Sequence, residues 1–347
     1  MRFAAVLCVL ALALAAACSS GDDRDATPST TQPAGTPAPT SPGARIQTGA
    51  KPWGVAVDPG RGFLYTSNEG EDTVSFVSLD SMVAVQTVPA GSGPSSIAVN
   101  TRTGFIYVTN AFSASVSVID ADESTVVATI PVEQKPWALA VDEASNRIYV
   151  ANADGDSISV IDGATESVVD TLTGVEEPWG LELSPDGATL YAASAAQHEI
   201  AIFDLASGEV GLRVGVGERP RGLALDAAAG RLYVSNVEEA TVSVIDLALA
   251  AVVDTVQVED LPQSVAVDAA AGRAYVANSF ASSVSVIDLT TDTVVDTLTV
   301  CSNPWDVTVG LDGALYVACS GSSQVIVFSP DVLAGLLSAA PDALQSE

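Results

Sequence analysis

Seven equivalent positions of a repeated pattern carry the side chains best suited to binding a small molecule. Each of these residues directly follows a proline, and together they are Trp53, Ser95, Trp137, Trp179, Arg221, Gln263 and Trp305. Aromatic planes beside one guanidinium can hold a sugar, an aromatic group or a small anion. The pattern predicts a ligand site. It also fits a second interpretation, in which each Trp shares a strand face with apolar residues such as Val55 and packs between neighbouring units.

His198 is the only histidine of the chain and stands between Gln197 and Glu199. A histidine beside a carboxylate can act as a general base. No GxSxG motif and no cysteine nucleophile accompany it. We therefore interpret His198 as an exposed loop residue and predict no catalytic residue.

The segment from Asn152 to Ser157 resembles the beginning of a calcium loop, because Asp154 and Asp156 supply closely spaced oxygens. The bidentate Glu that such a loop needs is missing at the required spacing, so we interpret the segment as a tight turn. One His and four Cys without a CxxC pair exclude a His-rich metal centre and haem ligation. No metal and no cofactor are predicted.

Charge excludes further classes of partner. The chain has 347 residues with 13 Lys plus Arg against 43 Asp plus Glu, a net charge of −30. The few Lys and Arg residues are scattered along the sequence, which leaves nothing to neutralise phosphates and little to attract anionic lipid. Binding of nucleic acid, or of a membrane through basic residues, is therefore not expected.

The acidic residues gather in one set of loops, at the same end of the fold as the Trp positions. They are Glu69, Glu71, Asp72, Asp154, Asp156, Glu176, Glu177, Glu238, Glu239, Glu259 and Asp260. The arginines of the opposite turns are Arg61, Arg102, Arg147, Arg231 and Arg273. We call the acidic end the upper face and interpret its charge as a solvated surface.

A repeat of 42 residues positions all these side chains. Seven prolines keep this spacing, from Pro52 to Pro304, and all seven tyrosines follow it from Tyr65, with one residue deleted before Tyr316. One unit contains four short apolar or alternating runs separated by turn residues, and Asp or Asn ends the first three, where its side chain can bond the turn backbone. The pattern predicts an all-β, seven-bladed propeller with four-stranded blades.

The residues from Tyr107 to Asn110 read Tyr-Val-Thr-Asn and, with the Pro-x-x-x-Ala-Val-Asp and Val-Ile-Asp elements, resemble the YVTN-repeat family of seven-bladed propellers over about residues 45 to 329. Blades depart from the motif where Ser194 and Cys319 replace the Asn and where Ser184 and Gly310 replace the first Asp. The resemblance implies the fold. It implies little about activity, because the motif positions are turns and core.

The N-terminal segment is expected to close the ring. The last strand of each repeat has a β-branched residue or Leu six positions before the next Pro, and Ile46 has the same offset from Pro52. The seventh unit supplies only three strands through Phe328 before Ser329 and Pro330, which suit a helix start. Residues 45–50 are therefore predicted to be the outer strand of the seventh blade, which removes an exposed edge.

Cys301 and Cys319 are predicted to form a disulfide. Cys301 precedes Pro304 by three residues and Cys319 ends the second strand of the same blade, so both lie on the upper face. The chain folds back between them and brings their α-carbons within the roughly 4.4–6.8 Å that a disulfide needs. An exported protein permits the oxidation.

The N-terminus reads as a targeting segment. Arg2 precedes an apolar stretch from Phe3 to Ala17, and the run from Leu14 to Cys18 resembles the lipobox of bacterial lipoproteins, although Ala15 stands where Leu is preferred. The resemblance implies a signal peptide over 1–17 and a lipidated Cys18. The alternative is an ordinary secretory signal in which Cys18 falls near the cleavage site by chance. Residues 18–44 are rich in Pro, Thr and Ser and fit a linker, followed by the propeller over 45–329 and a tail over 330–347, with a short helix.

These inferences combine into one functional hypothesis. We expect a monomeric propeller, anchored by lipid to the bacterial cell envelope outside the cytoplasm, that binds a small molecule, a saccharide or an envelope protein at its upper face. The alternative is a lactonase-like hydrolase working at the mouth of the central channel. A cluster of carboxylates and His in the channel would favour the enzyme, and a Trp-lined mouth favours binding.

Overall fold

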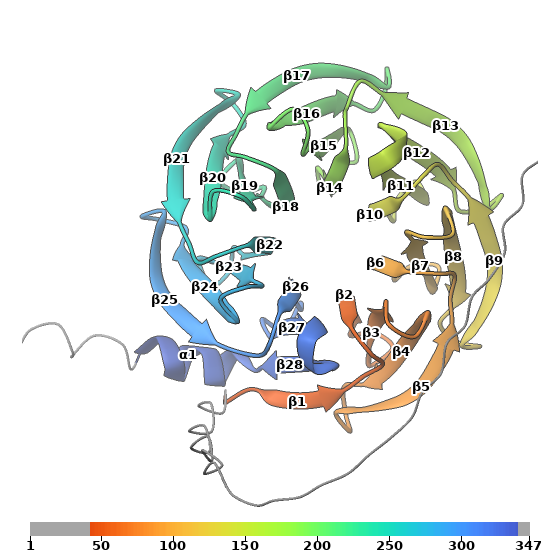
Figure 1. The fold of residues 1–347 in the computed structure, drawn as a ribbon, viewed down its shortest axis with the longest axis horizontal. Coiled ribbons are helices and arrows are strands. Elements are labelled where there is room, and N and C mark those ends of the chain that lie inside the picture. Colours follow the sequence, from red (N-terminus) through yellow and green to blue (C-terminus); the bar gives the residue numbers. More distant parts are fainter. Residues whose placement is uncertain (1–41, 339–347) are drawn as a thin grey trace, which may run out of the picture. The chain divides into compact units, whose positions relative to one another are not determined.

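The computed structural model describes residues 42–338, which form seven four-stranded antiparallel sheets arranged as the blades of one propeller (Figure 1). Blades 1 to 6 run in chain order from β2 to β25, and blade 7 has the order β1-β28-β27-β26. The predicted seven-bladed architecture is confirmed. Among the described residues, no helix is long and apolar enough to cross a membrane.

The inner strands surround the channel and begin at the repeat prolines. They are β2 (Pro52–Asp58), β6 (Pro94–Asn100), β10 (Pro136–Asp142), β14 (Pro178–Leu183), β18 (Pro220–Asp226), β22 (Pro262–Asp268) and β26 (Pro304–Val309). The second strands are β3 (Phe63–Asn68), β7 (Phe105–Asn110), β11 (Arg147–Asn152), β15 (Thr189–Ser194), β19 (Arg231–Asn236), β23 (Arg273–Asn278) and β27 (Leu315–Cys319).

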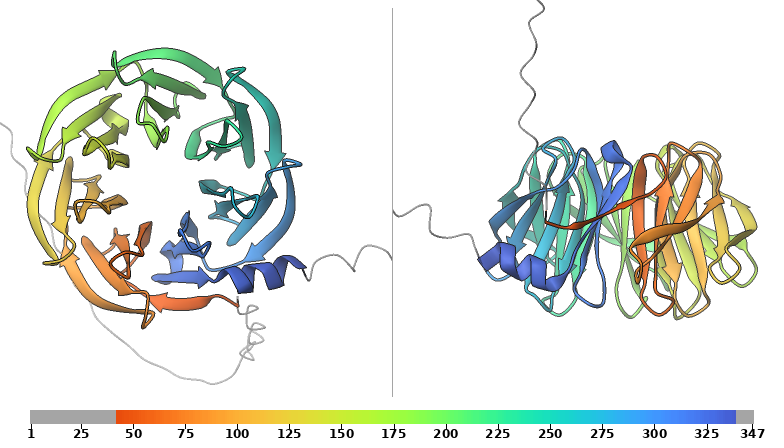
Figure 2. Two further views of the ribbon diagram at one scale, coloured as in Figure 1. Left: turned by 180° about the vertical axis from the view of Figure 1, so that it is seen from behind. Right: turned by 90° about the horizontal axis from the view of Figure 1, so that it is seen from below.

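The two outer layers complete each blade (Figure 2). The third strands are β4 (Thr73–Ser78), β8 (Ser115–Asp120), β12 (Ser157–Asp162), β16 (Glu199–Asp204), β20 (Thr241–Asp246), β24 (Ser283–Asp288) and β28 (Gln324–Phe328). The outermost strands are β5 (Val83–Pro89), β9 (Thr125–Pro131), β13 (Ser167–Thr173), β17 (Glu209–Gly215), β21 (Ala251–Gln257), β25 (Thr293–Thr299) and β1 (Ala44–Gln47). Short 3-10 turns at Ala153–Gly155 and Ser320–Ser322 follow β11 and β27.

Strand β1 closes the ring, as predicted, although it differs in extent from the expected residues 45–50. It pairs antiparallel with β28 from Ala44 opposite Val327 to Gln47 opposite Gln324, and the side chain of Ile46 is buried. The strand ends at Gln47 because the chain then turns toward β2, with Lys51 in the left-handed conformation. Helix α1 (Pro330–Ser338) follows β28, and the hydroxyl of Ser329 accepts a hydrogen bond from the Val332 amide at its start.

The apolar core consists of layers between neighbouring blades. In the layer between blades 1 and 2, Tyr65 and Phe76 face Ile106 and Val108, and the two aromatic rings meet edge to face at 4.9 Å. All seven repeat tyrosines are buried in such layers. Burial of Val, Ile and Tyr on both sides of each sheet holds each blade against its two neighbours.

The asparagines that end the second strands bond to hydroxyl groups, where the sequence suggested the turn backbone. The side-chain nitrogen of Asn236 donates to Thr241 Oγ1 at 3.0 Å and to Ser243 Oγ at 2.9 Å on the next strand, and the other four such asparagines do the same with residues five and seven positions later. The aspartates behave as expected, since Asp246 accepts two turn amides.

The predicted disulfide between Cys301 and Cys319 is present, with the two α-carbons 5.9 Å apart. Cys319 stands where five of the other blades have Asn and blade 4 has Ser194, and the residues five and seven positions after Cys319 are Gln324 and Ile326. An Asn there would lack its two hydroxyl partners. The disulfide instead ties the end of β27 to the connection that enters blade 7.

We predict that replacing Cys301 and Cys319 together with Ser lowers the free energy of unfolding by roughly 3 kcal/mol, because the bond closes a loop of 18 positions in the unfolded chain. Chemical denaturation under non-reducing conditions measures the difference. Reductant applied to the unfolded protein should lower the wild type to the level of the double variant and leave that variant unchanged. Equal stability of the two oxidised proteins would contradict the prediction.

Candidate binding site at the mouth of the channel

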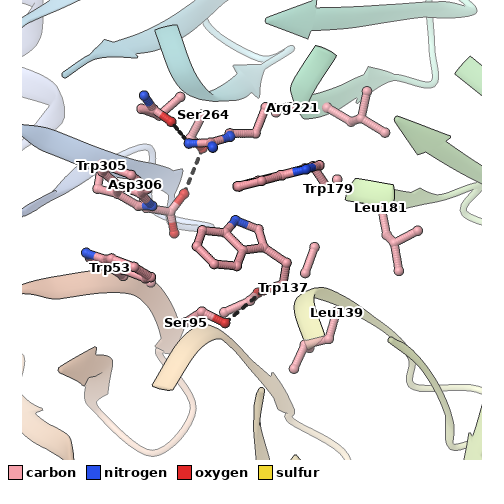
Figure 3. Close-up of a pocket in the computed structure, with 17 residues that line it drawn as sticks. Trp53, Ser95, Trp137, Leu139, Trp179, Leu181, Arg221, Ser264, Trp305 and Asp306 are labelled. Atoms are coloured by element: carbon pink, nitrogen blue, oxygen red, sulfur yellow. Dashed lines mark hydrogen bonds between the residues drawn. The ribbon is translucent and has the colours of Figure 1, made fainter. Parts of the chain in front are cut away.

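The start of every inner strand is irregular, and this irregularity positions the site residues. Pro52 pairs with Asn68 and Gly54 pairs with Ser67, so Trp53 lies between them without a partner on β3. The same register shift occurs at Trp179, Gln263 and Trp305. A β-bulge redirects the side chain of the extra residue, which here reaches into the upper end of the channel (Figure 3).

Close approach of the inner strands narrows the mouth. A β-carbon added to Gly180 would lie 1.8 Å from the backbone oxygen of Arg221, and one added to Gly222 would lie 2.7 Å from the α-carbon of Ser264. No side chain fits at such distances, so glycine is required where β14 meets β18 and where β18 meets β22.

The four Trp side chains form a continuous chain of ring contacts. Trp305 and Trp53 stack with centroids 5.0 Å apart and planes 10° apart, Trp53 meets Trp137 at 5.2 Å, and Trp137 meets Trp179 at 4.4 Å. Trp53 and Trp137 come from blades 1 and 3. They touch across blade 2, where the mouth position holds the small side chain of Ser95.

The guanidinium of Arg221 completes this arrangement. It lies 3.9 Å from the ring centroid of Trp179, 5.3 Å from that of Trp305 and 5.8 Å from that of Trp137. Its Nη1 donates a hydrogen bond to Gln263 Oε1, and Gln263 in turn donates to Ser279 Oγ at 3.0 Å. Desolvation of the guanidinium in this enclosed position lowers the pKa of Arg221.

Polar side chains hold one Trp ring and one Trp backbone at the mouth. Trp179 Nε1 donates to Glu177 Oε1 at 3.0 Å, and Arg219 donates to the same oxygen at 2.7 Å. The hydroxyl of Ser95 bonds to Thr109 Oγ1 at 2.8 Å and to the backbone oxygen of Trp137 at 3.1 Å. The ring of Trp179 is thus oriented by protein groups.

These residues enclose one cavity of about 170 Å³. All seven predicted mouth positions line it, together with the residues that follow them on the inner strands. The structure therefore brings the predicted set together, while ligand binding by that set stays a prediction.

Asp306 is the site residue that the sequence analysis missed. It lines the cavity and accepts hydrogen bonds from Ser264 Oγ at 2.7 Å and from the amides of Val55 at 3.0 Å and Val307 at 2.9 Å. It thereby joins blades 6, 7 and 1. The sequence did contain a signal for Asp306, because the equivalent position of the other six repeats holds Gly, Ser or Ala. Burial raises the pKa of Asp306 to about 6, despite the three donors, which oppose the rise.

The remaining candidates lie away from the cavity. His198 is exposed on the loop after β15, and its Nδ1 accepts the Arg219 amide at 3.1 Å. Asp154 pairs with Lys135 and Asp156 accepts the Glu177 amide, as expected of a turn. Across residues 42–338, no group of three or more His, Cys, Asp or Glu is placed to hold a metal ion.

Comparison with known proteins gives the family. The model of the seven-bladed β-propeller lactonases matches residues 20–270. The chain belongs to this lactonase family. Hydrazine synthase from Kuenenia stuttgartiensis is a similar solved structure, with a TM-score of 0.73 and 22% identity over 81% of this chain and 96% of that chain. At this identity the likeness shows the fold alone. No curated protein matches the sequence.

Membership in the lactonase family agrees with the propeller inferred from the repeats. It names neither YVTN repeats nor a lipoprotein signal, so both resemblances stay predictions. The signal peptide, Cys18 and most of the linker lie outside the described residues.

We predict that Asp306→Asn alters how the stability of this lactonase-family propeller depends on pH. A pKa of about 6 in the folded protein means that the folded state binds the proton more tightly than the unfolded chain, so the wild type loses stability from this group as pH rises from about 4 to about 6. Asp306→Asn does not lose stability in this way, because its amide does not titrate. Its free energy of unfolding minus that of the wild type should rise through this window and then level off.

Urea denaturation at several pH values tests this expectation. Ser264→Ala is the matched control, because it removes one hydrogen bond to Asp306 and keeps the titrating carboxyl group. A constant difference between Asp306→Asn and the wild type at every pH would contradict the assignment.

Proposed function

We propose that this protein is a non-catalytic binding or scaffolding module that works outside the cytoplasm. Its ligand-binding site is the mouth of the channel. The convergence of four Trp rings and Arg221 around one cavity supports this proposal most strongly. Concave sites with aromatic walls and a few oriented polar groups are typical of small-molecule binding. An envelope protein or a saccharide remains an alternative ligand at the same face.

The chemistry of the lining residues favours binding over catalysis. The lining contains Ser, Gln, Arg and Asp side chains and no His or Cys. Arg221 and Asp306 are hydrogen-bonded to protein groups. The lining hydroxyl of Ser264 is bonded to Asp306, but the Asp306 carboxylate also accepts two backbone amides, and among the described lining residues no His is present to activate the hydroxyl.

A lactonase-like hydrolase is the second candidate, and membership in the lactonase family favours it. Asp306 is the group in the mouth that could accept a proton from an attacking water, because a pKa of about 6 suits a general base near neutral pH. Release of acid from a simple lactone such as dihydrocoumarin, abolished by Asp306→Asn, would establish this activity.

Tryptophan fluorescence reports directly on the proposed site, because all four Trp residues of the chain line the cavity. We predict that Trp53→Ala and Trp179→Ala weaken the binding of small aromatic or saccharide ligands roughly 10-fold, by loss of ring contacts, and that the matching Phe variants lose less. Thermal unfolding is measured in parallel. Large losses of stability without a change in ligand binding would assign the rings to packing alone.

We also propose that Cys18 carries a lipid anchor in the cell envelope. The Cys301–Cys319 disulfide supports an oxidising compartment, and the residues from Leu14 to Cys18 support lipidation. We predict that Cys18→Ala moves the protein out of the membrane fraction or leaves its signal uncleaved. Mass spectrometry of the mature N-terminus decides, and an unmodified terminus at another residue would contradict the anchor.

A further inference from the structure

We propose that the mouth selects a small aromatic monocarboxylate, with Arg221 binding the carboxylate and the Trp rings enclosing the aromatic body. This inference rests on the proposed function of the mouth as a ligand site and names the class of ligand.

The charge of Arg221 is the feature of the mouth that points to an anionic ligand. Its guanidinium lines the cavity, and Gln263 is its single hydrogen-bond partner among the described residues. None of the ion pairs formed within residues 42–338 includes Arg221. A guanidinium has five N–H donors, so most of them stay open to the cavity. Glu177 attracts the guanidinium from the rim, but its carboxylate is bonded to Trp179 and Arg219, so the cavity side of Arg221 stays complementary to an anion.

Asp306 lines the same cavity but is not the anion that pairs with Arg221. The Asp306 oxygens accept bonds from Ser264, Val55 and Val307, which come from three different blades. These bonds hold the carboxylate against the wall at the junction of blades 6, 7 and 1. The charge of Arg221 is left for a group that enters from outside.

The aromatic rings favour an anion over a cation because Arg221 lies among them. Four Trp side chains alone would suit an organic cation, because aromatic faces attract positive charge. Here the guanidinium of Arg221 already covers Trp179 at 3.9 Å. A second cation would meet repulsion from Arg221, whereas an anion would be attracted to it.

Size and charge narrow the ligand further. The cavity measures about 170 Å³, and an apolar cavity of about 150 Å³ accommodates benzene. The cations nearest the mouth are engaged, because Lys135 pairs with Asp154 and Arg219 pairs with Glu177 and Glu238. Arg221 is the one available cation at the mouth within residues 42–338, and acidic residues of the upper face surround it, so a single negative charge fits better than the two charges of a phosphate monoester.

Four probes of similar shape test whether the folded, disulfide-bonded protein prefers an aromatic monocarboxylate. Benzoate, benzyl alcohol, benzylammonium and phenyl phosphate are titrated while Trp emission and heat of binding are followed. We expect benzoate to bind roughly 10- to 100-fold more tightly than benzyl alcohol, because hydrogen bonds between charged groups are added. Benzylammonium should bind more weakly than benzyl alcohol, and phenyl phosphate more weakly than benzoate.

Gln263→Glu tests the pairing of Arg221 with a carboxylate most directly. It keeps the size of the side chain that Arg221 already contacts and supplies an internal carboxylate at that place. Benzoate binding should fall roughly 10-fold or more, and by a larger factor than the binding of benzyl alcohol. Arg221→Met removes the charge and keeps the length, and should reverse the preference so that benzylammonium binds more tightly than benzoate.

The outcomes separate this inference from the function on which it rests. If benzyl alcohol or benzylammonium binds as well as benzoate to the wild type, or if Gln263→Glu leaves benzoate binding unchanged, the carboxylate selection is wrong and the mouth is still a ligand site. Tighter binding of phenyl phosphate than of benzoate also overturns the monocarboxylate. If none of the four probes changes Trp emission or releases heat at millimolar concentration, both the selection and the proposed ligand site fail.

Discussion

The pairing of β1 with β28 is the constraint on which the rest of the structure depends. Seven blades laid side by side would leave two apolar sheet faces and one strand edge open to solvent, and the four residue pairs of this ladder close that gap. Ile46 of β1 enters the apolar layer that joins Val55 and Leu64 of blade 1 to Tyr316 and Val325 of blade 7. The channel mouth exists because this layer holds the ends of the array together.

Two further features strengthen the same junction. The disulfide braces the one blade built from both ends of the described chain, and Asp306 connects blade 7 with blades 6 and 1 close to the channel. Ring opening should begin where chain continuity is missing. The disulfide adds a covalent link there, whereas the other blade interfaces combine apolar packing with hydrogen bonds and ion pairs, such as that of Arg231 with Asp292.

The seven blades share one backbone arrangement, but the side chains at their mouth positions differ. These differences determine the chemistry of the mouth. The repeat presents the same kind of bulged position seven times, and size differences at that position decide which rings meet. The small side chain of Ser95 lets Trp53 and Trp137 touch across a blade, and Gln263 reaches Arg221 from the next blade. Desolvation of the Arg221 guanidinium opposes the contacts that it makes with the rings, and a desolvated charge at a cleft is typical of a binding site.

Much of this protein follows from the sequence alone, because its repeat is local. The spacing of Pro52 and Tyr65 and their counterparts predicts the strands, the number of blades and the buried tyrosines, and two cysteines that depart from one repeat predict their own pairing. The offset of Ile46 predicts ring closure, although not that β1 ends at Gln47. The tertiary structure alone decided that the mouth residues are bulged, that Trp53 meets rings from blades 3 and 7, and that Asp306 lies between three blades. These contacts depend on the angles between blades and on how closely Gly180 and Gly222 let the inner strands approach. Periodicity along one chain carries no information about such distances between units.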